Sequence, residues 1–202
     1  MNKNNVIFTI GMILALILLS LSFSVQPNHF WTLFPFSLLL LTIYSWIFER
    51  HTFETPSLVQ WIIAIGSGVF IYLLFAIGKW LIVITDIPLL AQLQQLYLLV
   101  QPVEPIHYVW LFLVIIPGEE WFWRGFVVKH LSRRTSLLRA AFIGTLLYGA
   151  AHIVTGSILL VIAALIAGFV WSLLYVKTEN IILVIVSHLI FNLFLLVLFP
   201  LM

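Results

Sequence analysis

Seven polar or charged side chains interrupt the apolar C-terminal half of this 202-residue sequence, and their types suit the hydrolysis of a peptide bond. They are Glu119, Glu120, Arg124, Tyr148, His152, His188 and Asn192. A charged side chain inside a bilayer costs at least about 2.5 kcal/mol, so such residues indicate a functional site by default. Hydrolysis needs an activated water and donors that stabilise the developing oxyanion, and this set offers both.

The spacing within two segments predicts which side chains share a helix face. Tyr148 and His152 are four residues apart. His188 and Asn192 have the same spacing, so each pair faces one direction. At about 1.5 Å per residue from the expected cytoplasmic helix ends, Glu119 lies roughly 20 Å deep, His152 roughly 24 Å and His188 roughly 15 Å. These depths are compatible with one site in the membrane interior.

The two adjacent glutamates have different expected partners. Glu120 and Arg124 are four residues apart and can form an ion pair within one helix. Arg124 then keeps the local charge low and holds this helix in register. Glu119 points about 100° away from Glu120 on the helix, which leaves it free to face the centre of the bundle.

These positions suggest a division of roles in catalysis. Glu119, helped by His152, orients and deprotonates a water, because desolvation makes a carboxylate a better base than it is in water. His188 and Asn192 offer N–H donors on one helix face for the oxyanion. Tyr148 packs against or orients His152. The structural alternative is that the histidines and the asparagine bond neighbouring helices, but a shared depth for the whole set favours a site.

The composition predicts a polytopic helical membrane protein. Hydrophobic residues make up 63% of the chain, charged residues 8%, and the mean hydropathy is +1.20, far from a soluble domain. A barrel would show polar residues at every second position, and this pattern is missing. We expect an all-α bundle of seven spans, at Val6–Val25, Phe30–Phe48, Leu58–Ile84, Ile106–Val128, Ser136–Val154, Ile158–Val176 and Ile181–Phe199.

One membrane domain, 1–202, accounts for the chain. It divides into an N-terminal helical extension, 1–104, and a catalytic core, 105–202. Between the third and fourth spans, Asp86–Glu104 reads as a short amphipathic helix lying in the interface. Small residues four positions apart in the sixth span predict close packing at the bundle centre. They are Ala163, Ala164, Ala167 and Gly168.

The basic residues predict the orientation of the spans. All except Lys79 and Arg124 fall at alternate span ends, so the N-terminus is expected to be cytoplasmic, in a multi-pass protein of the cell membrane. These basic residues are Lys3, Arg50, Lys129, Arg133, Arg134, Arg139 and Lys177. Lys79 lies inside the third span and is expected to snorkel outward. The net charge of +2 gives no indication of a nucleic-acid partner.

Three motifs carry a family resemblance. The sequence has Glu-Glu-x-x-x-Arg at 119–124, an aromatic residue and His at 148–152, and His-x-x-x-Asn at 188–192. In this order and spacing they resemble the motifs of the CAAX-processing and bacteriocin-processing (CPBP, or Abi) intramembrane proteases. The resemblance implies an intramembrane endopeptidase that cleaves a peptide or membrane-attached protein substrate in the bilayer, and it assigns the same roles. Tyr148 departs from the usual Phe.

Metal dependence stays open. Glu119, His152 and His188 form a set of two histidines and one carboxylate that suits zinc with an open fourth position. The same residues serve in a glutamate-type protease without metal, and the resemblance implies either form. We expect no tightly bound cofactor, with zinc as the alternative. His-Glu-x-x-His is absent from the sequence, as is cysteine, which excludes thiol chemistry.

Other functions were compared with proteolysis. A catalytically silent scaffold or immunity protein would keep the same fold, and a proton-coupled small transporter would use the same Glu and His residues. A rhomboid-like Ser-His pair is not favoured, since Ser67 has no partner motif and Ser187 points away from the adjacent His188. Residues near span ends are expected to be interfacial: His29, His51, His107, His130, Trp31, Trp46, Trp61, Trp80, Trp110 and Trp171.

Overall fold

The structure is a computed structural model that describes residues 3–50 and 54–202, and within them every regular element is a helix. In the labels used here, η marks 3₁₀ and π segments. The elements are α1 (Lys3–Ser20), η1 (Leu21–Val25), η2 (Pro27–His29), α2 (Phe30–Phe48), α3 (Leu58–Ile84), α4 (Leu90–Val100), α5 (Pro105–Trp110), η3 (Leu111–Ile115), α6 (Ile116–Glu120), η4 (Trp121–Val128), α7 (Lys129–Ser132), α8 (Leu137–Ala151), η5 (His152–Thr155), α9 (Ile158–Thr178), α10 (Ile181–Asn192) and η6 (Leu193–Leu198). The all-α prediction is confirmed.

Six of the seven predicted spans are helices long and apolar enough to cross a membrane. They are Lys3–Val25, Pro27–Phe48, Leu58–Ile84, Leu137–Thr155, Ile158–Thr178 and Ile181–Leu198. The predicted fourth span lies in Pro105–Ser132, a rod made of the consecutive segments α5 to α7. This rod carries the buried charges and qualifies as a span when taken together with α4, from which it is bent by 94°.

The rod contains its own helix irregularities on either side of the two glutamates. Pro117 has no N–H and its ring collides with the carbonyl of a regular preceding turn, so the helix must adjust there. Wider π turns occupy Leu111–Ile115 before this proline and Trp121–Val128 after the glutamates. Such turns often occur at functional sites because they rotate the side chains that follow.

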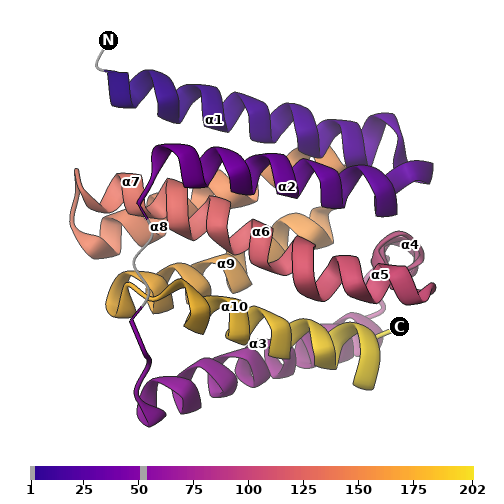
Figure 1. Cartoon of the computed structure of the whole chain (residues 1–202). Helices are drawn as coiled ribbons and strands as arrows, with labels where there is room; N and C mark the ends of the chain where they lie inside the picture. Colours follow the sequence, from indigo (N-terminus) through magenta and orange to yellow (C-terminus); the bar gives the residue numbers. More distant parts are fainter. Residues whose placement is uncertain (1–2, 51–53) are drawn as a thin grey trace.

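The helices form layers, which Figure 1 shows from the side. α1 and α2 form one outer layer, the rod lies next to them, and α10 lies between the rod and α3. α8 and α9 pack together behind the rod. In α9, Ala164, Ala167 and Gly168 are buried as predicted, whereas Ala163 is half-buried and lines the cavity.

Side-chain caps fix where three of the helices begin. Ser57 and Gln60 form a reciprocal capping box at the start of α3, with bonds of 2.9 and 3.3 Å. Ser157 accepts from the N–H of Leu160 at the start of α9, and Asn180 accepts from an N–H of α10 at 3.0 Å. These caps set the register of α10, which carries His188 and Asn192, and of the two helices packed against it.

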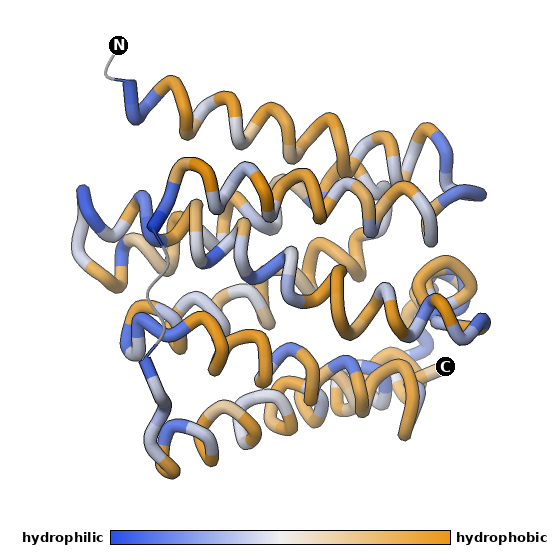
Figure 2. Tube along the Cα trace, in the orientation of Figure 1, coloured by the Kyte–Doolittle hydropathy of each residue, from blue (hydrophilic) through white to orange (hydrophobic). Residues whose placement is uncertain are grey.

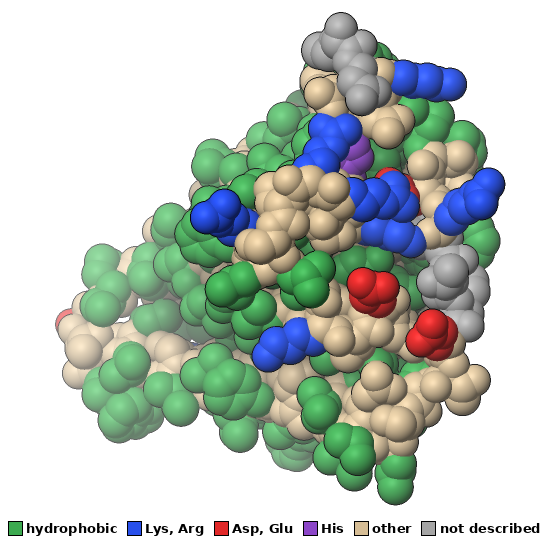
Figure 3. Space-filling model, turned by 90° about the vertical axis from the view of Figure 1, so that its left-hand side faces the viewer, with side chains coloured by type: hydrophobic (Ala, Val, Ile, Leu, Met, Phe, Trp, Pro, Cys, Tyr) green, Lys and Arg blue, Asp and Glu red, His purple; other side chains and the backbone are tan. Residues whose placement is uncertain are grey.

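The basic residues other than Lys79 and the buried Arg124 gather at one end of the bundle, on the face that Figure 3 shows. Their contacts join segments that are far apart in the sequence. Arg133 pairs with Glu49 at 2.8 Å, Arg134 donates to Asn5, and Lys129 donates to the main-chain oxygen of Arg50. This end therefore has the charge distribution that the sequence predicted.

Hydrophilic positions inside the bundle are concentrated near α6 and in α10, between apolar stretches (Figure 2). The short helix predicted between the third and fourth spans is α4; its placement in a membrane interface stays a prediction. The interfacial assignment of Trp171 was wrong. Its side chain is 2% exposed, whereas Trp46 is 51% and Trp80 59% exposed. The prediction failed because distance from a helix end does not reveal which face a ring occupies.

Candidate active site

Glu119, in α6 of the rod, lies at the centre of a buried polar cluster. The other members of this polar cluster are Glu120, Arg124, Tyr148, His152 and His188. One carboxylate oxygen, Oε1, is 4.0 Å from Nε2 of His152, and the other, Oε2, is 4.0 Å from Nε2 of His188. The hydroxyl of Tyr148 donates to Oε1 at 3.2 Å. These four side chains are buried. The structure thus brings together residues from three helices, as the similar depths expected from the sequence predicted.

His188 is held on its far side by Glu120. Nδ1 of His188 is 2.7 Å from Oε1 of Glu120, and the ring of Trp171 stacks on the imidazole with centroids 3.8 Å apart. Because both the ring plane and Nδ1 are fixed, Nε2 points towards Glu119. Sequence reasoning assigned Glu120 a single partner, Arg124, and missed both its bond to His188 and the stacking of Trp171.

Arg124 completes this part of the cluster. The predicted ion pair is present, with Nη1 of Arg124 3.1 Å from Oε1 of Glu120, and Nη2 donates to the main-chain oxygen of Gly168 at 3.1 Å. The guanidinium lies over the rings of Tyr148 and Trp171, 4.7 and 5.4 Å from their centroids, which adds cation–π attraction in a desolvated place. Arg124 is 1% exposed and Glu120 0%.

Gly168 is the close-contact point between α9 and this cluster. A Cβ added there would lie 2.8 Å from Cδ1 of Tyr148 and 3.2 Å from Nη2 of Arg124. A side chain at position 168 therefore collides with the ring beside His152 or displaces the guanidinium. Sequence reasoning assigned this glycine to helix packing and missed its contact with the site.

His152 lies where α8 tightens into the 3₁₀ turn η5. Its Nδ1 is 2.8 Å from the main-chain oxygen of Tyr148, and the Tyr148 ring meets the imidazole edge-on with centroids 4.5 Å apart. The turn ends at Gly156 with φ +70°, a left-handed conformation that glycine adopts without cost. The chain can thus reverse directly after the histidine and enter α9.

The partners of the two Nδ1 atoms define the protonation of the rings. A main-chain carbonyl and a carboxylate accept hydrogen bonds, so Nδ1 carries the proton in both His152 and His188. In the neutral rings, both Nε2 atoms then face Glu119 as acceptors. A separation of 4.0 Å exceeds a hydrogen bond, and an oxygen about 2.8 Å from both atoms fits between them. A water, with two O–H donors, matches this set.

Asn192 lies one turn after His188 and also lines the cavity next to the cluster. Its Nδ2 donates to the main-chain oxygen of His188 at 3.3 Å. A side-chain amide has two N–H bonds. One therefore anchors the side chain to α10 and the second is available to a bound molecule.

The donor set for zinc was tested against the geometry. Tetrahedral zinc with bonds of about 2.0 to 2.1 Å places its ligand atoms about 3.3 Å apart, whereas the nitrogen–oxygen separations around Glu119 are 4.0 Å. Among residues 3–50 and 54–202, no group of three His, Asp or Glu side chains is close enough together to hold a metal. These positions do not fit zinc as they stand.

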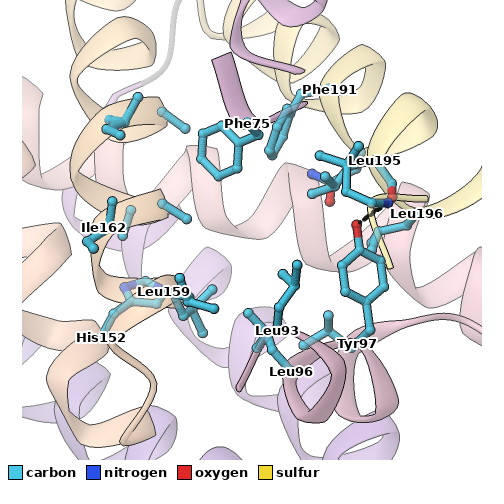
Figure 4. Close-up of a pocket in the computed structure, with 18 of the residues that line it drawn as sticks. Phe75, Leu93, Leu96, Tyr97, His152, Leu159, Ile162, Phe191, Leu195 and Leu196 are labelled. Atoms are coloured by element: carbon cyan, nitrogen blue, oxygen red, sulfur yellow. Dashed lines mark hydrogen bonds between the residues drawn. The ribbon is translucent and has the colours of Figure 1, made fainter. Parts of the chain in front are cut away.

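The site opens into a cavity of about 420 Å³. Side chains from α3, α4, α9 and α10 point into the shared space, with His152 and Tyr97 on opposite sides (Figure 4). The walls are largely apolar, and Glu119, Tyr148, His188 and Asn192 also line it. A cavity of this kind, with a few convergent polar groups, is typical of a binding site.

The remaining polar candidates lie elsewhere. Ser67 and Ser187 bond each other at 2.8 Å, and Trp171 donates to Ser187 at 3.2 Å, which is a packing role. His107 stacks on Trp31 with centroids 4.4 Å apart. His130 is buried against Phe8 rather than interfacial, and His51 lies outside the described residues.

Comparison with known proteins supports one class of protein. A family model described as Type II CAAX prenyl endopeptidase Rce1-like matches residues 101–194. This range contains all three motifs and every residue of the polar cluster. The predicted resemblance to the CPBP family is thus confirmed, and the family match supports a CAAX-type intramembrane protease. None of the curated proteins or solved structures compared with the chain matches it.

Proposed function

We propose that this protein is an endopeptidase that hydrolyses a peptide bond of a membrane-attached substrate with a water held by Glu119 and His152, while His188 and Asn192 stabilise the oxyanion. One observation carries the proposal. A single buried carboxylate faces two imidazole Nε2 atoms at 4.0 Å each, beside a cavity large enough for a peptide segment. The family match supports the reaction class independently.

Glu119 activates the water, with His152 beside it. The water donates one O–H to Glu119 and the other to Nε2 of His152, which leaves an oxygen lone pair for the substrate carbonyl carbon. As the carbon–oxygen bond forms, Glu119 accepts the proton and the carbonyl becomes an oxyanion. Glu119 then passes this proton to the leaving nitrogen as the carbon–nitrogen bond breaks, which yields an acid and an amine.

His188 and Asn192 stabilise the oxyanion. The second N–H of Asn192 is available for this purpose. His188 donates through Nε2 when the ring carries a second proton, and Glu120 is then its counter-ion at Nδ1. Donors that face the developing charge in a dry site are worth about 10²- to 10³-fold in rate.

The charges of the cluster balance in this state. Glu119 and Glu120 contribute two negative charges, and Arg124 and protonated His188 contribute two positive ones. A neutral cluster costs least inside a bilayer, because an uncompensated buried charge has lost its hydration. Arg124 therefore acts through Glu120 and does not touch the reacting atoms.

The substrate class follows from the family and from the location. A CAAX-type protease acts on a membrane-attached protein, and the apolar cavity wall suits a lipid-linked or hydrophobic segment near a C-terminus. A prenyl group on that segment is an expectation from the family description. The clustered basic end (Figure 3) supports a cytoplasmic N-terminus in a cell membrane.

The two parts of the chain act as one domain in this proposal. α3, from the extension 1–104, packs along α10 and supplies cavity-lining side chains, including Leu74 and Phe75. α4 supplies Leu93 and Tyr97. The core 105–202 thus carries the reacting groups, while the extension contributes walls of the binding cavity.

Cleavage of a peptide library by the purified protein in detergent tests the proposal. We expect the wild type to cleave at defined sites and Glu119→Ala to lose at least about 10³-fold in rate, because the general base is gone. Glu54→Ala is the matched control, since Glu54 is exposed on a loop, and it keeps full activity. Metal analysis of the same samples shows whether zinc is bound.

The alternatives give different outcomes. A silent scaffold cleaves nothing, and its cellular phenotype survives Glu119→Ala and His188→Ala at normal protein levels. A proton-coupled transporter shows proton-dependent uptake in vesicles without cleavage. Equal cleavage by the wild type and Glu119→Ala would remove Glu119 from the mechanism.

A further inference from the structure

The indole of Trp171 is a buried ring in α9 that lies directly on a histidine of the polar cluster. Its plane is inclined by 22° to the imidazole of His188, with centroids 3.8 Å apart. On its edge, Nε1 donates to the hydroxyl of Ser187 at 3.2 Å. The ring that touches the site is thus itself held by a hydrogen bond from outside the cluster.

Two serine hydroxyls continue this bond into α3. The hydroxyls of Ser187 and Ser67 lie 2.8 Å apart, and Ser67 donates to the main-chain oxygen of Ala64 at 2.9 Å. A hydroxyl has one hydrogen to donate, so Ser187 donates to Ser67 and accepts from Trp171. The packing contact between the two serines therefore links the indole N–H to the main chain of α3.

The helix α3 is pressed against α10 at this level. A Cβ added at Gly68 would lie 2.5 Å from the main-chain oxygen of Ser187, so a glycine is required for the approach. One turn further along each helix, Phe75 meets Phe191 edge-on with centroids 5.1 Å apart (Figure 4). Phe191 in turn meets Trp171 edge-on at 5.8 Å. α3 thus restrains the indole by two routes.

We propose that Ser67 and Trp171 are positioning residues that act on catalysis through His188. Ser67 fixes the indole by way of Ser187, and the indole fixes the plane of the imidazole. This inference rests on the proposed function and adds two residues that act without bonding the water or the oxyanion. Ser67 lies outside the range 101–194 that the family model matches, so a residue of the extension 1–104 takes part in arranging the site.

The stacked ring supplies a restraint that Glu120 alone does not. The bond of 2.7 Å from Nδ1 of His188 to Glu120 fixes one atom of the imidazole, but not the plane of the ring. A tilt of that plane moves Nε2 away from the oxyanion, and a misplacement of about 1 Å can cost about 10²-fold in rate. An aromatic face also attracts a cation that lies over it, so the indole complements the positive charge of His188 in the proposed reaction.

Steady-state cleavage of a fluorogenic peptide tests the role of the ring. We expect Trp171→Leu to lower kcat about thirtyfold, because the plane and the cation–π contact are lost together. Trp171 also lines the cavity, so an unchanged KM is the result that separates positioning from substrate binding. Phe126→Leu is the matched control, since Phe126 is buried against Phe122 and lies outside the cavity wall. It lowers the melting temperature and leaves kcat within about twofold.

The hydroxyl route is tested by Ser67→Ala and by a double variant. Loss of one hydrogen bond is expected to lower kcat about fivefold, with KM unchanged. Trp171→Phe keeps a ring but lacks the N–H, so it shows a similar loss. Because the route is then already broken, Ser67→Ala in the Trp171→Phe background causes no further loss. Ser37→Ala breaks another buried pair of serines, Ser22 and Ser37 at 3.2 Å, and leaves kcat unchanged.

Nuclear magnetic resonance of histidine-labelled protein in detergent gives a readout that does not need cleavage. The stacked indole shifts the ring protons of His188 upfield through its ring current, and His188→Gln assigns these signals. Trp171→Leu removes the shift and Ser67→Ala reduces it, whereas Ser37→Ala leaves it in place.

The outcomes separate this inference from the proposed function. Cleavage by the wild type with a kcat that neither Trp171→Leu nor Ser67→Ala lowers would overturn the positioning roles and leave hydrolysis standing. Independent, multiplying losses in the double variant would show that Ser67 does not act through the indole. A His188 signal that depends on both residues, found together with no cleavage by the wild type, would uphold the positioning of the ring and refute hydrolysis by Glu119.

Discussion

The end of α8 and the middle of α10 each present a histidine to Glu119, and they do so with different supports. Both Nε2 atoms lie 4.0 Å from the carboxylate. Nδ1 of His152 meets a main-chain carbonyl at 2.8 Å, while Nδ1 of His188 meets the carboxylate of Glu120 at 2.7 Å. A neutral acceptor fixes the direction of a ring, and a charged acceptor also stabilises a positive charge on it. The two histidines therefore suit different tasks in one reaction.

The difference also determines how each support can fail. The carbonyl behind His152 belongs to the backbone of α8 and persists when side chains change. The support behind His188 is a chain of side chains, from Glu120 to Arg124 and on to the main chain of Gly168. Every member of that chain is buried, so removal of one leaves another without compensation. We expect the α10 side of the site to be the more sensitive to mutation.

Among the residues that support the two histidines, the largest expected effect is that of Glu120→Gln. The amide keeps the shape of the carboxylate but cannot act as counter-ion to a protonated His188, so we expect kcat to fall about a hundredfold with KM little changed. Steady-state cleavage of a fluorogenic peptide measures both constants. Such a result would confirm that the support of His188 is electrostatic.

Glu49→Gln is the matched control for this change. Glu49 is likewise buried and paired with an arginine, Arg133, at 2.8 Å, but it lies at the basic end of the bundle. Its replacement is expected to alter thermal stability and leave kcat within about twofold, since it touches no group of the site. Equal losses of kcat in both variants would show that the effect of Glu120 is on stability alone.

An intermediate effect is expected for Gly168→Ala, which disturbs the surroundings of both histidines. The new methyl group lies 2.8 Å from the Tyr148 ring and 3.2 Å from Arg124, so one of them must move. We expect about a tenfold loss of activity and a stability loss of about 1 to 3 kcal/mol, typical of overpacking. Thermal melting in detergent and the cleavage assay report the two losses.

Gly66→Ala serves as the control, because nothing lies within 4 Å of a Cβ added at Gly66. It is also a glycine in a long apolar helix, and alanine is the better helix former. The melting temperature of Gly66→Ala should equal or exceed that of the wild type. If Gly168→Ala melts and cleaves like Gly66→Ala, the close contact of α9 with the site has no consequence.

The sequence was sufficient for the fold class and for the grouping of the polar residues. Apolar runs longer than about 18 residues define membrane helices without tertiary information. The spacing of four residues placed His188 and Asn192 on one face and paired Glu120 with Arg124, and the structure has both features. Their catalytic roles stay predictions. Local periodicity is enough for such statements because they concern one helix at a time.

Contacts between helices could not be obtained in this way. The bond from Glu120 to His188 spans 68 positions, and helix periodicity allowed Glu120 just one partner, within its own helix. The stacking of Trp171 on His188 depends on how α9 is rotated against α10. Lys79 was expected to snorkel outward and instead lines the cavity, a place that depends on how α3 packs along α10. Rotation and packing are set by the surrounding helices, which a single sequence does not describe.

The smallest expected effect is that of Tyr148→Phe, on the α8 side. The change removes one hydrogen bond to Glu119, of 3.2 Å, and a bond of this kind is worth about 0.5 to 1.5 kcal/mol. The ring remains, with its contacts to His152, Arg124 and Trp123 at centroid distances of 4.5, 4.7 and 5.0 Å. We therefore expect about a threefold loss of kcat, measured in the same peptide assay.

Tyr148→Leu separates the hydroxyl from the ring. Leucine loses the edge-on contact with His152 and the cation–π contact with Arg124, so its activity should fall further than that of the Phe variant. The main-chain carbonyl of residue 148, which holds Nδ1 of His152, is present in both variants, so neither should approach the loss expected for Glu120→Gln. A hundredfold loss in Tyr148→Phe would mean that the hydroxyl, and not the backbone, is the support on which the α8 side depends.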